Sequence, residues 1–119
     1  PEQRREFAMI GVAARLAKYP KLSDEALQAN RKRQRELLRR EALAAYGNKC
    51  QCCGETDHRF LSIDHINGGG NQHKKITHGN TCRWLRRNNF PSGFQVLCYN
   101  CNCAKGIFGH CPHKKIGEQ

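Results

Sequence analysis

The sequence has few acidic residues, few aromatic residues and no long apolar segment. No stretch approaches the length that crosses a membrane, and the first residues, Pro1 to Glu6, lack the apolar run of a secretory signal peptide. We therefore expect a cytoplasmic protein with no membrane partner. Aromatic residues form only 8% of the chain and hydrophobic residues 38%, so we expect the cysteine-rich part to need a cross-link in addition to its small core.

The shortage of acidic residues makes the chain strongly basic. Its 119 residues include 21 Lys and Arg against 10 Asp and Glu, which gives a net charge of +11 at pH 7. An excess of this size on a small protein usually indicates a polyanionic partner, and nucleic acid is the first candidate. The length fits one domain with an appendage. We divide it into an N-terminal helical arm (1–46), a folded domain (47–113) and a basic C-terminal tail (114–119).

Cysteine is abundant, with eight residues. Four of them form two Cys-x-x-Cys pairs, and a long loop can bring two such turns together around a tetrahedral ion. We predict one structural zinc ion, with no open position for chemistry, bound by Cys50, Cys53, Cys98 and Cys101. A disulfide framework is the alternative for a short secreted chain, and the absence of a signal peptide argues against it.

The other cysteines are expected to pack as small buried hydrophobic residues. They are Cys52, Cys82, Cys103 and Cys111. A second metal site around Cys111, Pro112 and His113, with His110 close by, is the less favoured alternative, because a free cysteine is more often packed in the core than metal-bound.

Two helical patterns precede the cysteines. The first covers about residues 3–18, and the second begins near Ser23, a suitable N-cap, and ends at Gly47. At helical spacing one side of the second helix is apolar, with Leu27, Leu37, Leu38 and Ala45. The rest is basic, and we predict sequence-independent contact with the DNA backbone through Arg31, Lys32, Arg33, Arg35, Arg39 and Arg40. An ordinary solvated face is the alternative.

The cysteine-rich part consists of short elements separated by Gly and Asn. Residues 60–66 and 94–97 have the patterns of strands, and residues 102–108 that of a short helix. Between the strands lie a polar insert (71–80) and a basic amphipathic segment (81–87), which adds candidate nucleic-acid contacts at Arg83, Arg86 and Arg87. The predicted fold class is α+β, with two strands and a helix around zinc and an N-terminal helical extension.

Three segments together match a known family in order and approximate spacing. They are Cys50-x-x-Cys53-Gly54, then Ile63-Asp64-His65-Ile66 followed by glycines, then Leu97-Cys98-x-x-Cys101-Asn102-x-x-Lys105-Gly106. The combination resembles the HNH endonucleases, which have the His-Me finger or ββα-metal fold, and especially the small zinc-stapled versions common in phages. The resemblance covers about residues 47–107. A zinc ribbon alone would give no reason for the Asp-His pair after the first knuckle.

The resemblance implies a metal-dependent DNA endonuclease that hydrolyses phosphodiester bonds and nicks one strand at each site. His65 would be the general base, and Asp64 and Asn102 would hold a catalytic Mg²⁺ or Mn²⁺ ion. Lys105 would neutralise the scissile phosphate or only pack. His73 is a candidate phosphate contact, with a solvated side chain as the alternative. The implied setting is the cytoplasm of a bacterial host, with double-stranded DNA and other phage DNA-processing proteins as partners.

One position departs from the family pattern. The family has its middle Asn shortly before the second cysteine pair, where this chain has Gly93. Either a backbone carbonyl near Gly93 orients His65, or the site is weaker than usual. An asparagine of the insert could also substitute, and the candidates are Asn71, Asn80, Asn88 and Asn89. The departure keeps open a rival of another class, a non-catalytic zinc-stapled module that binds nucleic acid. An RNA-directed nuclease would use the same residues.

Overall fold

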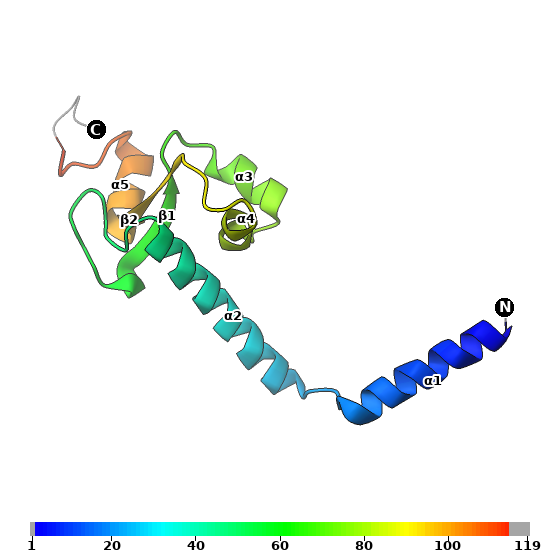
Figure 1. The fold of residues 1–119 in the computed structure, drawn as a ribbon. Coiled ribbons are helices and arrows are strands. Elements are labelled where there is room, and N and C mark those ends of the chain that lie inside the picture. The colour runs from blue at the N-terminus through cyan, green and yellow to red at the C-terminus, as the bar shows by residue number, and fades with distance from the viewer. Residues whose placement is uncertain (1, 115–119) are drawn as a thin grey trace. The chain divides into compact units, whose positions relative to one another are not determined.

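The computed structural model describes residues 2–114 and has an α+β architecture (Figure 1). In this range the elements are α1 (Glu2–Lys18), α2 (Asp24–Ala45), the 3-10 turn η1 (His58–Phe60), β1 (Leu61–His65), α3 (Gly70–Thr77), α4 (Thr81–Arg87), β2 (Phe94–Cys98) and α5 (Tyr99–Phe108). The predicted α+β class is confirmed. Residues 115–119 of the predicted C-terminal tail lie outside the described range.

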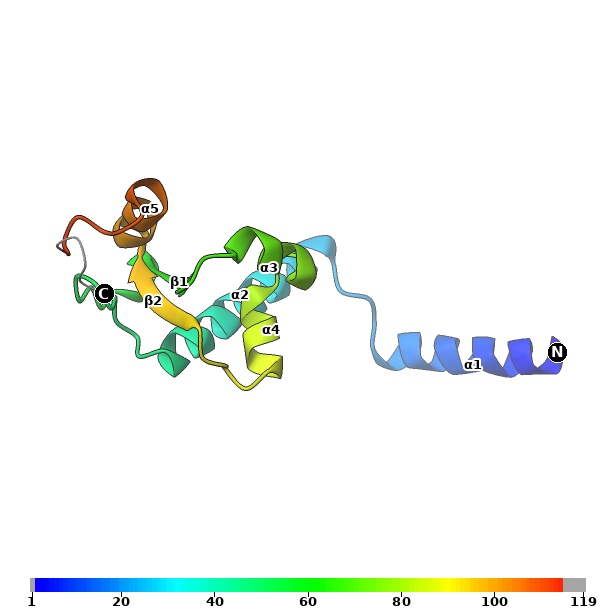
Figure 2. The same cartoon turned by 90° about the horizontal axis from the view of Figure 1, so that it is seen from above.

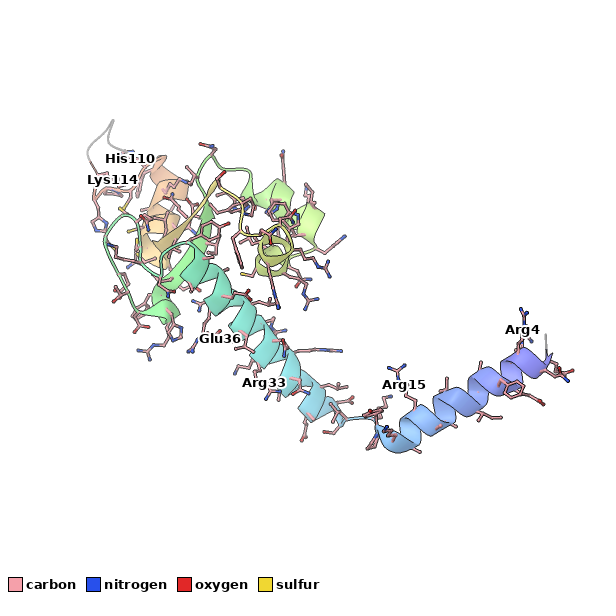
Figure 3. The ribbon with its side chains drawn as sticks, viewed as in Figure 1. Arg4, Arg15, Arg33, Glu36, His110 and Lys114 are labelled. Carbon is pink, nitrogen blue, oxygen red and sulfur yellow. The ribbon has the colours of Figure 1, made fainter. Side chains whose placement is uncertain are left out.

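The chain divides into two compact units inside α2, between Arg33 and Gln34. In the first unit, large apolar side chains of α1 are exposed, among them Phe7 at 74% and Met9 at 71%. Arg4 and Arg15 extend from the same helix (Figure 3). The predicted boundary after residue 46 falls at the end of α2, whereas the last turns of this helix belong to the second unit.

Helix α2 begins as the sequence predicts but packs through other residues. Ser23 Oγ accepts a hydrogen bond from Ala26 N at 3.2 Å, which caps the helix. The predicted apolar face is wrong at Leu37, which is 54% exposed, and at Ala45, which is also exposed, whereas Ala42 and Leu43 are fully buried. Only the last turns of α2 carry buried residues, so the position along the helix, rather than its periodicity, decides which side chains are covered.

The sheet consists of β1 and β2 in antiparallel register, with Asp64 opposite Gln95 and His65 opposite Phe94. Opposed residues share a face and successive residues alternate, so Asp64 and His65 lie on opposite faces. Helix α5 lies on the Asp64 side of the strands, and α3 and α4 lie on the other side (Figures 1 and 2). The strand pair therefore separates the two groups that the sequence places side by side.

The core of the second unit joins aliphatic and cysteine side chains. Leu43, Leu61 and Val96 are fully buried, and they cluster with Cys50, Cys98, Cys101 and Cys111. Because so few large apolar side chains contribute, the burial available to stabilise this unit is small, as the composition predicts.

Helix α3 is the element that the sequence analysis treats as a polar insert. It begins at Gly70, directly after Gly68 and Gly69, whose φ angles of +74° and +83° place them in the left-handed region that favours glycine. The charged and polar residues of this helix carry too weak an apolar pattern to reveal it. Helix α4 has the predicted bounds, and α5 begins at Tyr99, earlier than predicted.

Candidate metal centre and active site

The four predicted zinc ligands lie together. The ligand atoms of the group are all within 4.8 Å of one another, and the group consists of Cys50, Cys53, Cys98 and Cys101. Cys53 Sγ and Cys98 Sγ, which come from the two knuckles, are 3.6 Å apart. Each knuckle is closed by a backbone N–H directed at sulfur, from Cys53 to Cys50 at 3.5 Å and from Cys101 to Cys98 at 3.4 Å. This group can hold a structural metal ion such as zinc.

The protein environment acts differently on the pKa values of these thiols. Burial raises the pKa of Cys50, but backbone N–H groups, first that of Cys53, outweigh it and lower the pKa to about 6. Burial, followed by hydrogen bonds with other thiols, raises the pKa of Cys101. A fully buried thiol of this kind ionises when a metal ion supplies the compensating charge, so zinc binding at this centre releases protons.

His65 stands at the end of β1 with its ring held by aromatic neighbours. Its Nε2 lies 2.9 Å from Nδ1 of His73, and its ring centroid lies 4.8 Å from that of Phe94. Burial, then the charges of His73 and Lys105, lower the pKa of His65 from its ordinary value of 6.5, against the opposing charge of Asp64. The imidazole is therefore neutral at pH 7 and able to accept a proton.

His73 orients His65, and the sequence analysis did not find this role. Its ring centroid lies 4.3 Å from that of Trp84 and 5.7 Å from that of Phe94, which fixes it between α4 and β2. Its Nε2 is buried and has no hydrogen-bond partner in the described part of the chain. His73, predicted as a candidate phosphate contact, is thus half-buried, and its Nδ1 faces the ring of His65.

Asp64 is almost completely buried beneath α5. Its Oδ2 accepts hydrogen bonds from Lys105 Nζ at 2.6 Å and from Gln95 Nε2 at 2.9 Å. Lys105 also donates to the carbonyl oxygens of His65 at 3.2 Å and Ile66 at 3.0 Å. The three bonds use the hydrogens of the ammonium group, so Lys105 ties α5 to the end of β1. The sequence analysis leaves two roles for Lys105, neutralising the scissile phosphate or packing, and these contacts correspond to packing.

Asn102 reaches the same face of the sheet from the first half of α5. Its Nδ2 donates to Ser62 Oγ at 3.1 Å, and the Ser62 hydroxyl donates to the carbonyl oxygen of Leu97 at 2.9 Å. The amide oxygen of Asn102 accepts no hydrogen bond from residues 2–114, and neither does Oδ1 of Asp64. Two oxygen atoms of the class that Mg²⁺ and Mn²⁺ prefer therefore remain for a ligand.

A cavity of about 490 Å³ follows the edge of β1. Residues from both faces of the sheet line it, among them His65 on one side and Asn102 on the other. In the described chain β1 pairs with β2 alone, so the cavity lies at the open edge of the strand. Arg39 and Lys74 contribute basic groups, and none of the described lining residues is acidic. Asp64 does not line the cavity.

Gly93, which stands where the HNH resemblance predicts an asparagine, contacts the end of β1 through its backbone. Gly93, with φ of +100°, accepts a hydrogen bond at its carbonyl oxygen from Ile66 N at 3.0 Å. The carbonyl therefore holds the chain directly after His65, whereas His73 holds the imidazole.

The predicted phosphate contacts fall into two sets. Some side chains already have partners: Arg39 donates to the carbonyl oxygens of His58 and Leu61, Arg40 bonds Glu36 and His58, Arg33 bonds Asn30, and Arg86 pairs with Glu41 at 3.7 Å. The others are exposed and have no side-chain hydrogen bond or ion pair within residues 2–114: Arg31, Lys32, Arg35, Arg83 and Arg87. The second set is the one available to a polyanion.

The chain matches no protein-family model, no curated protein and no solved structure. Within the described residues, no helix combines the length and the apolar character that crossing a membrane requires. The assignment of function therefore depends on the residues of the site.

Proposed function

We propose that this protein is a metal-dependent endonuclease of the HNH type that nicks DNA, with His65 as the general base. The observation that carries the proposal is the cavity at the open edge of β1, which is lined by His65 from one element, by Asn102 from another and by basic groups. The order β1, β2 and α5, with a cysteine knuckle at the junction of β2 and α5, supports assignment to the ββα-metal fold.

The reactive nitrogen of His65 is Nδ1. When Nε2 donates its proton to Nδ1 of His73, the imidazole keeps a lone pair on Nδ1. This atom faces Gly70, which also lines the cavity. A water molecule gives a proton to Nδ1 as its oxygen forms a bond to phosphorus, the bond from phosphorus to the leaving sugar oxygen breaks, and solvent protonates that oxygen.

Asp64 and Asn102 would hold the divalent ion. When bound, Mg²⁺ or Mn²⁺ supplies a Lewis acid that stabilises charge on the phosphate oxygens. The two free oxygens fit such an ion in kind, and Lys105 keeps the other carboxylate oxygen of Asp64 occupied. The exposed arginines of α2 and α4 would bind phosphates along the duplex without reading bases.

The test is cleavage of supercoiled plasmid with Mg²⁺, with Mn²⁺ and with chelator. We expect nicked circles with either ion and none after chelation, with zinc content unchanged at the chelator concentration used. Direct conversion to linear plasmid without a nicked intermediate would contradict one-strand cleavage. Single-stranded RNA in parallel reactions separates a DNA nuclease from an RNA-directed one.

One contact favours the rival function, a non-catalytic module that binds nucleic acid. The ammonium group of Lys105 lies 2.6 Å from Asp64 and already neutralises the carboxylate that a catalytic ion would need. A module of this kind would bind DNA with an affinity that depends strongly on salt, and His65→Ala would leave that affinity unchanged. It would not cleave DNA, whichever divalent ion was added.

Replacing Gly70 with alanine is expected to lower nicking by about tenfold, since small displacements of a reacting group are costly. A Cβ at this position would lie 3.2 Å from Nδ1 of His65 and would cover the proposed reactive atom. Gly70 is outside the left-handed region and begins α3, so alanine does not strain the backbone. The measurement is the single-turnover nicking rate together with the melting temperature.

Gly106→Ala is the matched control, because a Cβ there meets no atom within 4 Å. It also places alanine in a helix, and we expect the wild-type nicking rate. Equal nicking rates for Gly70→Ala and Gly106→Ala would exclude Nδ1 of His65 as the atom that accepts the proton.

The pH dependence of nicking is expected to have its acid limb below 6.5. The general base must be unprotonated, and the pKa of His65 lies below 6.5 because of burial and the charge of His73. Nicking is therefore expected to be at full rate at pH 7 and to fall only as the pH drops below 6.5, where the imidazole becomes protonated. The profile of kcat/KM with pH measures this, and an acid limb above pH 6.5 would contradict it.

A further inference from the structure

A second group of metal-ligating side chains lies next to the predicted zinc quartet. Its ligand atoms are all within 4.8 Å of one another, and it consists of Cys52, Cys101, Cys111 and His113. Helix α5 is capped by Gly109, whose left-handed backbone turns the chain so that Cys111 enters the core and His113 approaches Cys52 of the first knuckle. His110 and Lys114 flank this segment (Figure 3), and neither belongs to the group.

The nitrogen–sulfur separations in the second group suit a tetrahedral site. Nδ1 of His113 lies 3.3 Å from the sulfur of Cys111, 3.4 Å from that of Cys101 and 3.8 Å from that of Cys52. Zinc bonds of about 2.3 Å to sulfur and about 2.0 Å to nitrogen, at tetrahedral angles, place sulfur and nitrogen about 3.6 Å apart. Three thiols around one ring nitrogen at this spacing form a Cys₃His ligand set.

The two groups share one atom, the sulfur of Cys101. Cys101 is fully buried, so its sulfur is screened from water, and it lies within 4.8 Å of the ligand atoms of both groups. A thiolate sulfur has more than one lone pair and can bind two ions at once. A single ion would complete only one group, and would leave the remaining thiols of the other crowded together without a partner.

We propose that the protein binds two zinc ions in a binuclear cluster with Cys101 as the bridging thiolate. The first ion is bound by Cys50, Cys53, Cys98 and Cys101, and the second by Cys52, Cys101, Cys111 and His113. The second ion fastens the segment after α5 to the loop between Cys50 and Cys53. This cluster is independent of the proposed nuclease function, because none of its ligands is assigned to the reaction.

Zinc content measured by native mass spectrometry and by elemental analysis tests the proposal. Wild-type protein is expected to carry two zinc ions per chain. His113→Ala removes an exposed ligand of the second ion alone and is expected to carry one, as is Cys52→Ser. Cys103→Ser, in which the replaced cysteine belongs to neither group, is the matched control and is expected to keep two. One ion in the wild-type protein, or two in His113→Ala, would overturn the proposal.

Cadmium substitution tests the bridge itself. With ¹¹³Cd in both sites, the wild-type protein should give two cadmium resonances that split each other through the shared sulfur. In His113→Ala a single unsplit resonance is expected. Two resonances without mutual splitting in the wild-type protein would show separate sites and would overturn the bridging role of Cys101. Neither measurement requires nuclease activity, so failure of the nuclease proposal would leave this result intact.

Discussion

Replacing His65 with alanine is expected to lower the rate of plasmid nicking by about 10²–10⁴-fold, the usual contribution of a general base. The proposed mechanism gives the imidazole the only proton-accepting role, and its lowered pKa keeps it unprotonated at pH 7. DNA affinity is expected to stay at the wild-type level, because the exposed arginines that would bind phosphate belong to other elements. Single-turnover cleavage and a binding titration, both at one fixed salt concentration, measure the two effects separately.

The control for this experiment is His78→Asn. His78 is exposed and ends α3 with a φ of +53°, a left-handed conformation that asparagine adopts readily. The substitution removes an imidazole that does not line the cavity, so we expect nicking at the wild-type rate. Zinc content must be the same in all three proteins. Wild-type nicking by His65→Ala would exclude the proposed base, whereas loss of nicking together with loss of zinc would indicate a structural effect.

Replacing Cys101 with serine is expected to unfold the second unit. The thiol is fully buried in the core cluster and belongs to both metal groups, so the substitution removes ligands from each ion. Structural zinc contributes apparent free energies of about 10–16 kcal/mol in small zinc domains. This is comparable to the whole stability of a typical domain, which is roughly 5–15 kcal/mol. Near-UV circular dichroism from Trp84 and limited proteolysis should show loss of the cooperative transition.

Cys103→Ser is the control for Cys101→Ser. It removes a thiol from α5 without removing a metal ligand, so it separates the effect of losing a thiol from the effect of losing metal. Its side chain is exposed, and we expect the wild-type melting temperature. His113→Ala should fall between the two variants, with one ion and a lowered melting temperature. A Cys101→Ser protein that melts as wild type does and retains zinc would contradict both the stabilising role of the metal and the shared ligand. Treating the wild-type protein with a strong chelator should reproduce the loss of structure.

The first metal group and the order of elements follow from local sequence. Each Cys-x-x-Cys pair closes a turn by itself, and the Ser23 cap and the left-handed Gly109 fix helix ends within a few residues. Helix α3 escaped prediction because its residues are mostly polar. The apolar face of α2 was wrong at Leu37 because periodicity cannot tell which turns of a long helix meet a core.

The details of the site depend on contacts between distant segments. The sequence places Asp64 beside His65, but the pleat of β1 directs one toward α5 and the other toward α3. Lys105 of α5 bonds Asp64 on one face of the sheet, and His73 of α3 contacts His65 on the other face. Local sequence patterns do not predict these contacts, because the contacts form only when the helices pack against the strands.

By itself the sequence determined the basic character, the α+β class and the residue types that can bind zinc and accept a proton. Only the tertiary structure decided which groups those residues meet. It brought Cys52, Cys111 and His113 to Cys101 and left the edge of β1 open as a cavity. The physical reason is that turns and helix caps are set by neighbours within a few residues, whereas metal ligands and hydrogen-bond partners are set by the packing that brings separate segments together.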